Sequence, residues 1–403
     1  MTIPTNEESK KVMTHILECL QPTRVRNVYI TTAIIWLSTS IGIVFFTGAC
    51  YVYVQIRHPR LAAVLHPYSP HAHAKALHTL SPSAAAGLFR EFDKLEASRM
   101  FVYKPWVGFS ERTFHSALLN IDEGEPLPIR RTIEPADAGA SNKTIWLFGG
   151  STQFGWGVPD DQTIASRLSA ILSTSRTHYT VVNYGHTEFY SSQEALLFAT
   201  LLRHGHKCDI AVFLDGLNDS YGPRNDTPDM TVGTAYGFLQ QEDAAAAENS
   251  RYVIITPFFP PVRVMNGVLR RLGPLPKASP EAAGRLSGTK YDPVAIYRFN
   301  MSMIKEIAES EKIQVSFYWQ PTPFDYMAGA DQRRAMSVDQ ENIPSVNLRV
   351  RQTIKNRSFH FVADMFKEEA FDDIYVDGDH YGDRGNRMIA QVIADGLKND
   401  GLL

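Results

Sequence analysis

The stretch Thr144–Gly157, TIWLFGGSTQFGWG, takes the chain from an apolar run into a glycine-rich turn that holds one serine. Glycine permits positive φ angles and the close approach of other groups, so such a turn can present a side chain to a ligand. The turn lacks the Gly-Lys-Ser/Thr of a phosphate-binding P-loop, and Asp160 stands where a dinucleotide-binding loop needs its third glycine. The Gly-x-Ser-x-Gly elbow is also absent, because Gln153 stands two residues after Ser151. The stretch is therefore either a nucleophile turn of another kind or an ordinary tight loop.

Apolar or β-branched runs alternate with amphipathic segments from residue 143 onward. The runs are TIWLF, TVVNY, IAVFL, VSFYW and FHFVA, and such runs are typical of strands covered on both faces. The segments Thr163–Ser173, Gln193–Arg203 and Pro293–Glu311 repeat apolar residues at helical spacing. This alternation predicts a three-layer α/β/α domain with a mostly parallel sheet. Ligands of such sheets lie beyond the carboxyl ends of the strands.

The residues that follow the predicted strands supply the groups needed for acyl transfer at a serine. Ser151 follows the first strand, Gly185 the second and Asn218 the third, while Asp377 and His380 stand just before the last predicted helix. Ser151 would attack a carbonyl carbon, His380 would carry its proton, and Asp377 would orient the imidazole. The N–H groups of Ser151 and Gly185 and the side-chain amide of Asn218 would stabilise the resulting oxyanion.

The ordered blocks GGST, NYG, GLND and DGDH resemble the four blocks of the SGNH hydrolase superfamily, the GDSL-like esterases and lipases, over roughly residues 144–400. The resemblance implies an SGNH/flavodoxin-like α/β fold. The residues that it matches to the family's catalytic and oxyanion groups are Ser151, Gly185, Asn218, His380 and Asp377. Gly150 departs from the family pattern, because it stands where the usual motif has an aspartate.

We expect a serine esterase that hydrolyses carboxylic esters of a lipid or an acylated glycan through an acyl-serine intermediate. The same triad would serve an O-acyltransferase acting on an envelope polysaccharide, with a sugar hydroxyl in place of water. Gly150 leaves a further alternative, a membrane-tethered binding protein whose serine site is vestigial. The acyl group, the alcohol and the oligomeric state do not follow from the sequence.

Neither a cofactor nor a metal ion is expected at the site. Asp377, Asp379 and Asp383 suggest calcium at first sight, but the regular Asp-x-Asp-x-Asp-Gly spacing is broken. A histidine-rich stretch could chelate a transition metal, although a solvated linker explains it as well. Its members are His66, His71, His73 and His78. The net charge of −3 gives no reason to expect nucleic acid as a partner.

The sequence from residue 28 to residue 56 carries no charged side chain, and a bilayer-spanning helix needs about 20 apolar residues. We therefore expect a transmembrane helix at residues 28–56. The Lys and Arg residues before it slightly outnumber those after it, which favours a cytoplasmic segment at residues 1–27 and an extracytoplasmic catalytic domain. A protease-protection assay that finds the C-terminal domain inside would reverse this orientation. A cleaved lipoprotein signal is disfavoured, because Thr47 replaces the usual leucine and the apolar run continues past Cys50.

The rest of the chain divides into a juxtamembrane extension at residues 57–142 and the hydrolase domain at residues 143–403. Within that domain, residues 258–290 interrupt the α/β alternation with six basic residues against Glu281 alone. This insertion could form a lid or lie on anionic head groups, or it could be an ordinary solvated insertion. A chain of 403 residues with 44% hydrophobic residues can bury a substantial core, and its three distant cysteines predict neither a disulfide framework nor a zinc finger.

Overall fold

The computed structural model describes residues 22–57, 77, 79–97, 101–136, 143–173, 179–220, 292–325 and 343–403, together with residues 7, 10, 11 and 14. The chain divides into two compact units. One comprises Met1–Pro67 and Glu248–Ser279, and the other comprises Tyr68–Ala247 and Pro280–Leu403. The four histidines considered for a metal and the insertion at residues 258–290 lie outside the described residues.

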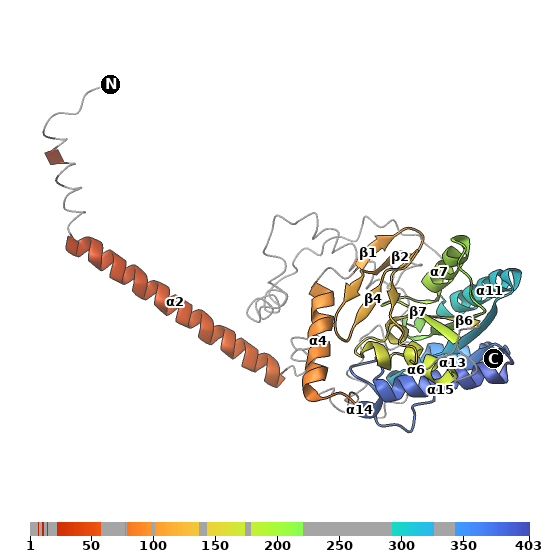
Figure 1. Ribbon diagram of the computed structural model, residues 1–403. Coiled ribbons are helices and arrows are strands. Elements are labelled where there is room, and N and C mark those ends of the chain that lie inside the picture. The colour runs from red at the N-terminus through yellow and green to blue at the C-terminus, as the bar shows by residue number, and fades with distance from the viewer. Residues whose placement is uncertain are drawn as a thin grey trace. The chain divides into compact units, whose positions relative to one another are not determined.

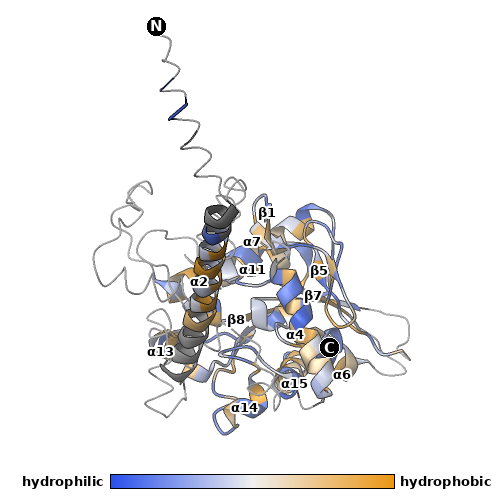
Figure 2. Cartoon of the chain, turned by 90° about the vertical axis from the view of Figure 1, so that its left-hand side faces the viewer, coloured by the Kyte–Doolittle hydropathy of each residue, from blue (hydrophilic) through white to orange (hydrophobic). Residues whose placement is uncertain are grey.

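The first unit contains the long helix α2, Pro22–Arg57. Hydrophobic residues cover much of its described part (Figure 2). The window Tyr29–Phe46 has a mean hydropathy of 1.8, and none of it is buried inside the structure. Helix α2 is therefore long and apolar enough to cross a membrane, as expected, although a signal sequence near the N-terminus would meet the same description.

The second unit is built around a central sheet (Figure 1). The sheet has eight strands in the order β10-β9-β8-β6-β7-β5-β4-β3. The strands from β6 to β10 run parallel to one another. Their bounds are Lys143–Gly149 for β6, Tyr179–Gly185 for β7, Ile210–Asp215 for β8, Gln314–Trp319 for β9 and Phe359–Phe361 for β10. Taken in chain order, these strands have the 2-1-3-4-5 arrangement of flavodoxin-like sheets. The predicted α/β fold with a mostly parallel sheet is thus confirmed.

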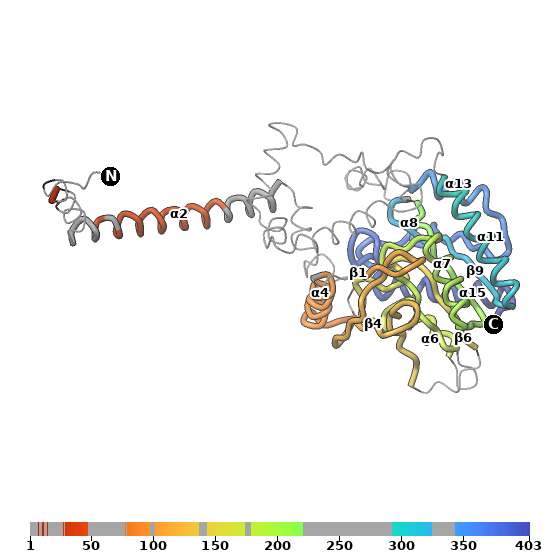
Figure 3. Tube along the Cα trace, turned by 90° about the horizontal axis from the view of Figure 1, so that it is seen from above, coloured from red at the N-terminus to blue at the C-terminus, as the bar shows by residue number. Residues whose placement is uncertain are grey.

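Helices cover both faces of the parallel strands and make the outer two layers. One core contains aromatic side chains of the strands, such as Phe148 and Phe213, packed against α7, α11 and α13. The other lies between the opposite face and helices α6 and α15. The bounds of these helices are Ile164–Leu172 for α6, Ser191–Arg203 for α7, Pro293–Glu311 for α11, Ile343–Thr353 for α13 and Asp383–Asn399 for α15. Helices α7 and α11 lie side by side in Figures 1 and 3.

The helix expected at Pro293–Glu311 begins and ends where its sequence signals stand. The Asp292 carboxylate accepts a hydrogen bond of 3.0 Å from the N–H of Val294, and Pro293 occupies the first helical position. At the other end, Lys312 takes a left-handed conformation and its N–H donates to a carbonyl of the last turn. Strand β9 then begins at Gln314, two residues after Lys312.

Part of the predicted juxtamembrane extension, residues 57–142, joins the main sheet. Strand β5 pairs antiparallel with β7 at Arg130 and Asn183, and β4 and β3 follow outward from β5. The elements of this region are α4 at Pro82–Ala97, β1 at Phe101–Lys104, β2 at Gly108–Glu111, β3 at Phe114–His115, β4 at Asn120–Asp122 and β5 at Ile129–Arg130. Strands β3, β4 and β5 have only two or three residues, which is too short to give a period-two pattern in the sequence.

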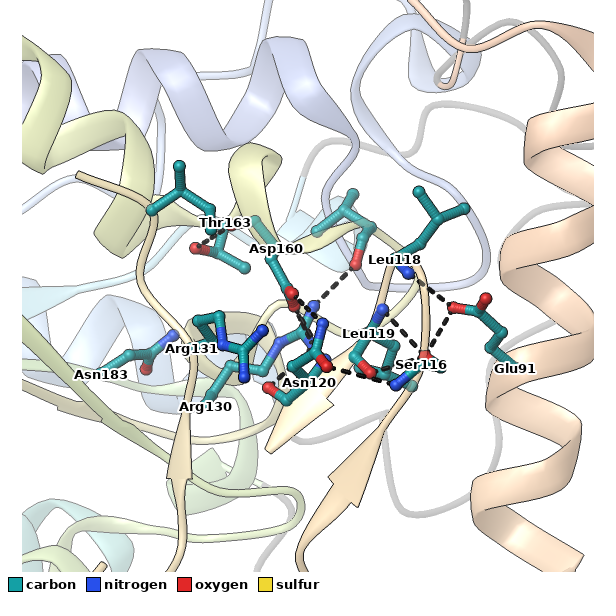
Figure 4. A network of polar contacts seen from close by, with 12 residues as sticks. Glu91, Ser116, Leu118, Leu119, Asn120, Arg130, Arg131, Asp160, Thr163 and Asn183 are labelled. Carbon is teal, nitrogen blue, oxygen red and sulfur yellow. Dashed lines mark hydrogen bonds and ion pairs between the residues drawn. The ribbon is translucent and has the colours of Figure 1, made fainter. Parts of the chain in front are cut away.

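A buried ion pair joins these N-terminal strands to the turn that follows Ser151 (Figure 4). The Nη1 atom of Arg130 lies 2.7 Å from the Asp160 carboxylate, which also accepts hydrogen bonds from the backbone and side chain of Asn120. Burial lowers the pKa of Arg130 to about 10, so the group stays cationic at neutral pH. Its guanidinium lies 5.3 Å from the ring centroid of Phe154, within the serine turn. The N-terminal region therefore supports the turn that carries the candidate nucleophile.

Candidate active site

Ser151 lies at the carboxyl end of the central strand β6, where it begins the short helix α5, Ser151–Phe154. The turn is closed by backbone hydrogen bonds from Phe154 N–H to Gly150 C=O and from Gly155 N–H to Ser151 C=O. The hydroxyl of Thr152 donates to Gln320 Oε1 at 2.7 Å, which ties the turn to the residue after β9. Strand β6 has β7 on one side and β8 on the other, so Ser151 lies where the strand order reverses and ligands of such sheets bind.

His380 and Asp377 lie in a tight loop between α14, Phe371–Ile374, and α15. A β-bridge between Tyr375 and Tyr381 closes this loop. The Oδ1 atom of Asp377 accepts the backbone N–H groups of residues 379 and 380 at 3.0 and 2.8 Å. These two bonds fix the carboxylate, so its second oxygen is held toward the imidazole.

The structure brings the three predicted triad residues together. His380 Nε2 lies 2.7 Å from Ser151 Oγ, and His380 Nδ1 lies 2.7 Å from Asp377 Oδ2. Both distances are within hydrogen-bond reach, as a nucleophile, its base and the base's orienting carboxylate require. The indole of Trp156 lies beside the imidazole, with 6.2 Å between ring centroids, and it borders the site.

The ionisation of the His–Asp pair follows from its partners. Burial alone would lower the pKa of His380, but the charges of Asp377 and Asp379 and the hydrogen bond to Asp377 raise it to about 9. Burial alone would raise the pKa of Asp377, but the charge and hydrogen bonds of His380 outweigh burial and lower it. Asp377 therefore stays ionised, and His380 is an unusually strong base.

Gly185, the expected oxyanion donor, lies against the serine turn, and its backbone N–H is engaged within the fold. That N–H donates to the side-chain oxygen of Asn183 at 2.9 Å, and the Asn183 amide donates to Gln153 C=O at 3.1 Å. A Cβ on Gly185 would lie 2.4 Å from the backbone nitrogen of Phe154, so only glycine allows β7 to approach the turn this closely. The Gly185 N–H can reach a substrate oxygen only if its bond to Asn183 is exchanged.

Asn218 is the second residue of the short helix α8, Leu217–Ser220, and its side-chain amide packs against the serine turn. Its side-chain nitrogen donates to Phe189 C=O at 2.7 Å, which uses one of the two N–H bonds of the amide. A Cβ on Gly150 would lie 2.6 Å from this nitrogen and 3.0 Å from Phe189 O. In the conformation seen here, a side chain at residue 150 would therefore require the Asn218 amide to shift.

Asp383, considered with Asp377 and Asp379 for calcium, binds cations of the protein instead. As the first residue of α15 it accepts a hydrogen bond from Arg167 Nε at 2.7 Å and one from Arg387 at 2.9 Å. Donor atoms of Asp377, Asp379 and His380 do lie within 4.8 Å of one another. These atoms are close together because the His380 imidazole lies beside the carboxylates of Asp377 and Asp379.

A contact that the sequence did not indicate holds the loop after Gly185. The buried carboxylate of Glu111 at the end of β2 lies 2.7 Å from His186 Nδ1 and accepts the backbone N–H of Thr187 at 2.5 Å. Burial would raise the pKa of Glu111, but the His186 charge and these hydrogen bonds lower it. A single Glu in a short strand carries no sequence signal for such a role. The pairing comes from the fold of the N-terminal region.

Buried carboxyl groups also lie behind the Asn218 turn. Asp219 accepts hydrogen bonds from the N–H and hydroxyl of Ser191, which tie α8 to the start of α7. Tyr297 of α11 donates to Asp215 Oδ2 at 3.1 Å. Burial and the Asp219 charge raise the pKa of Asp215 to about 7, while burial and the Asp215 charge raise that of Glu194 well above its usual range. This cluster, Glu194, Asp215 and Asp219, holds protons at neutral pH that exposed carboxyl groups would have lost.

No family model and no curated protein matches the chain. Among solved structures, it is similar to a G-D-S-L family lipolytic protein from Desulfitobacterium hafniense, with 11% identity, 64% of this chain and 100% of that chain covered, and a TM-score of 0.33. It is also similar to a lipase/acylhydrolase from Enterococcus faecalis, with 16% identity, 64% and 96% coverage and a TM-score of 0.35. An acetyl xylan esterase, AlAXEase, matches with 13% identity, 63% and 99% coverage and a TM-score of 0.37.

The G-D-S-L description is that of the superfamily whose four sequence blocks this chain resembles.

Proposed function

We propose that the protein is a serine hydrolase that cleaves carboxylic esters. The observation that supports this most directly is the continuous hydrogen-bonded row from Ser151 through His380 to Asp377, with 2.7 Å at each step. The three side chains come from two loops that are 229 residues apart between Ser151 and His380. A vestigial binding site would have no need to keep such a row aligned.

The reaction follows from the proton positions in this row. Neutral His380 accepts the Ser151 hydroxyl proton at Nε2 while Oγ attacks the ester carbonyl carbon. Asp377 accepts the Nδ1–H bond and stabilises the imidazolium that forms. His380 then gives the proton to the leaving alcohol, and the acyl group remains on Ser151. Water, activated by the same imidazole, attacks the acyl-serine and releases the acid.

The negative charge on the substrate oxygen needs fixed donors. Ser151 is the first residue of α5, where backbone N–H groups have no acceptor within the helix, so its N–H is available. The second N–H of the Asn218 amide is the other donor that we assign to the oxyanion. Gly185, expected as a third donor, serves mainly to let β7 pack on the turn in this proposal.

We also propose that α2 is retained as a membrane anchor with a cytoplasmic N-terminus, which puts the hydrolase domain outside the cytoplasm. Its length and hydropathy support an anchor, and the slight excess of basic residues before it supports the orientation. A lipid or an acylated glycan close to the membrane would then be the ester substrate. Protection of the C-terminal domain from protease added to sealed, right-side-out cells would contradict the orientation.

Labelling by a fluorophosphonate probe tests the hydrolase proposal without knowledge of the substrate. The full-length chain in detergent should be labelled at one serine, and Ser151→Ala should abolish labelling because the nucleophile is removed. Ser302→Ala is the matched control, since Ser302 is exposed on α11 and donates only to a carbonyl of its own helix. Folded wild-type protein that takes no label at any pH would contradict the proposal.

A further inference from the structure

The His380 imidazole has a second carboxylate beside it, in addition to that of Asp377. Asp379 Oδ1 lies 3.1 Å from His380 Nδ1, the atom that also lies 2.7 Å from Asp377 Oδ2. The Nδ1 atom carries one proton. The contact to Asp377 meets the geometry of a hydrogen bond, while Asp379 is in ion-pair contact with the same nitrogen.

The two carboxylates are held in different ways. Asp377 accepts two backbone N–H bonds through Oδ1, so its position is fixed by the loop itself. About a fifth of the Asp379 side chain is exposed. Asp379 directly precedes His380 in the chain, and its carboxylate lies beside the imidazole. Asp377 therefore has the geometry of the orienting residue, and Asp379 adds negative charge at the same edge of the ring.

We infer that Asp379 is a positioning residue that holds His380 in its protonated form and thereby sets the lowest pH at which Ser151 can be activated. The inference rests on the proposed hydrolase function. Among the described residues, the charged groups that act on His380 are Asp377 and Asp379, and the side chains of Ser151 and Trp156, which flank the ring from the serine turn, carry no charge.

The direction of the effect follows from the proton balance. A carboxylate beside an imidazole favours the imidazolium, and only the neutral imidazole can take the Ser151 proton. With a pKa of about 9 for His380, about one hundredth of the molecules hold a neutral base at pH 7. Removal of the Asp379 charge should lower the pKa of His380 and increase this fraction.

The second-order rate of fluorophosphonate labelling, measured from pH 6 to pH 10 on the full-length chain, tests the inference. Asp379→Asn should move the acid limb of the profile down by about one pH unit, so labelling at pH 7 should become about tenfold faster. The rate at pH 10 should change by less than about threefold, because Asp377 still orients the ring. Asp379→Glu, which retains the charge, should keep the limb near its wild-type position.

Two further variants separate this role from others. Asp377→Asn should slow labelling at every pH, because the acceptor that orients Nδ1 is lost. Asp372→Asn removes the same charge from an exposed position in the preceding helix and should leave the profile unmoved. An Asp379→Asn profile that falls at all pH values, or keeps its acid limb, would overturn the inference while leaving the hydrolase proposal intact. Absence of wild-type labelling at every pH would overturn the hydrolase proposal itself.

Discussion

At the scale of single residues, the absence of a side chain at Gly150 leaves room for the Asn218 amide beside the serine turn. The sequence alone presents Gly150 as a loss relative to the family motif, and the structure gives it a positive role, because a Cβ there would lie 2.6 Å from the Asn218 nitrogen. The meeting of Ser151, His380 and Asp377 was predictable, since Ser151 follows a strand and the other two lie shortly before the last helix. The second carboxylate at His380 was visible in DGDH as a residue, but its contact with Nδ1 depends on a loop conformation that no periodicity encodes.

Restoring the family's aspartate with Gly150→Asp should therefore reduce activity. The new side chain would displace the Asn218 amide, the oxyanion donor that we propose, and loss of one such donor typically costs about 10² to 10³ in rate. The measurement is the fluorophosphonate labelling rate at pH 10, where His380 is largely neutral in the wild type. Asn218→Ala should show a similar loss, and the double variant should be little worse than either, because both remove the same donor. Faster labelling by Gly150→Asp would refute this explanation.

At the scale of elements, strands and helices with strong periodicity were predictable, and short or buried polar connections were not. The helix expected at Pro293–Glu311 has those bounds in the structure, and each expected apolar run from β6 to β10 is a strand. By contrast, the carboxyl groups of Glu194, Asp215 and Asp219 come from helix α7, the end of β8 and the short helix α8. Their meeting depends on how α7 packs on β8, which is a tertiary property.

The buried acid cluster should make the protein less stable as the pH rises. The pKa of Asp215 is about 7 in the folded protein and about 4 in an unfolded chain, so the folded state binds more protons between these values. The stabilisation is then complete below about pH 4 and is lost as the pH rises through 7. The asparagine side chain of Asp215→Asn stays neutral over this whole pH range. The melting temperature of Asp215→Asn minus that of the wild type should increase from pH 5 to pH 8. The corresponding change in the difference between their free energies of unfolding is about 2 to 4 kcal/mol.

Thermal unfolding followed by circular dichroism at a series of pH values measures this difference. Asp372→Asn again serves as the control, because an exposed carboxylate should give no such trend. A difference between Asp215→Asn and wild type that stays constant from pH 5 to pH 8 would mean that Asp215 does not titrate in this range.

At the scale of the whole molecule, the compact unit that carries the site begins earlier than the sequence indicated. Arg130 pairs with Asp160, and Glu111 pairs with His186, so residues before 143 hold both the serine turn and the loop after Gly185. A chain that starts at residue 68 should therefore be soluble and labelled by fluorophosphonate at a rate close to that of the full chain. A chain that starts at residue 143 should misfold, because β7 loses its neighbour β5 and Asp160 loses its buried cation. Efficient labelling of the shorter chain would show that the N-terminal strands are dispensable.

The His380 imidazole and the buried carboxyl cluster respond in opposite ways to a rise in pH. The imidazole is mostly neutral only in alkaline solution, while the carboxyl cluster behind Asn218 is least costly to the fold in acid. An optimum of activity against pH would then have limits of different origin on its two sides. On the acid side turnover would stop reversibly through protonation of one ring, and on the alkaline side it would decay with time as molecules denature.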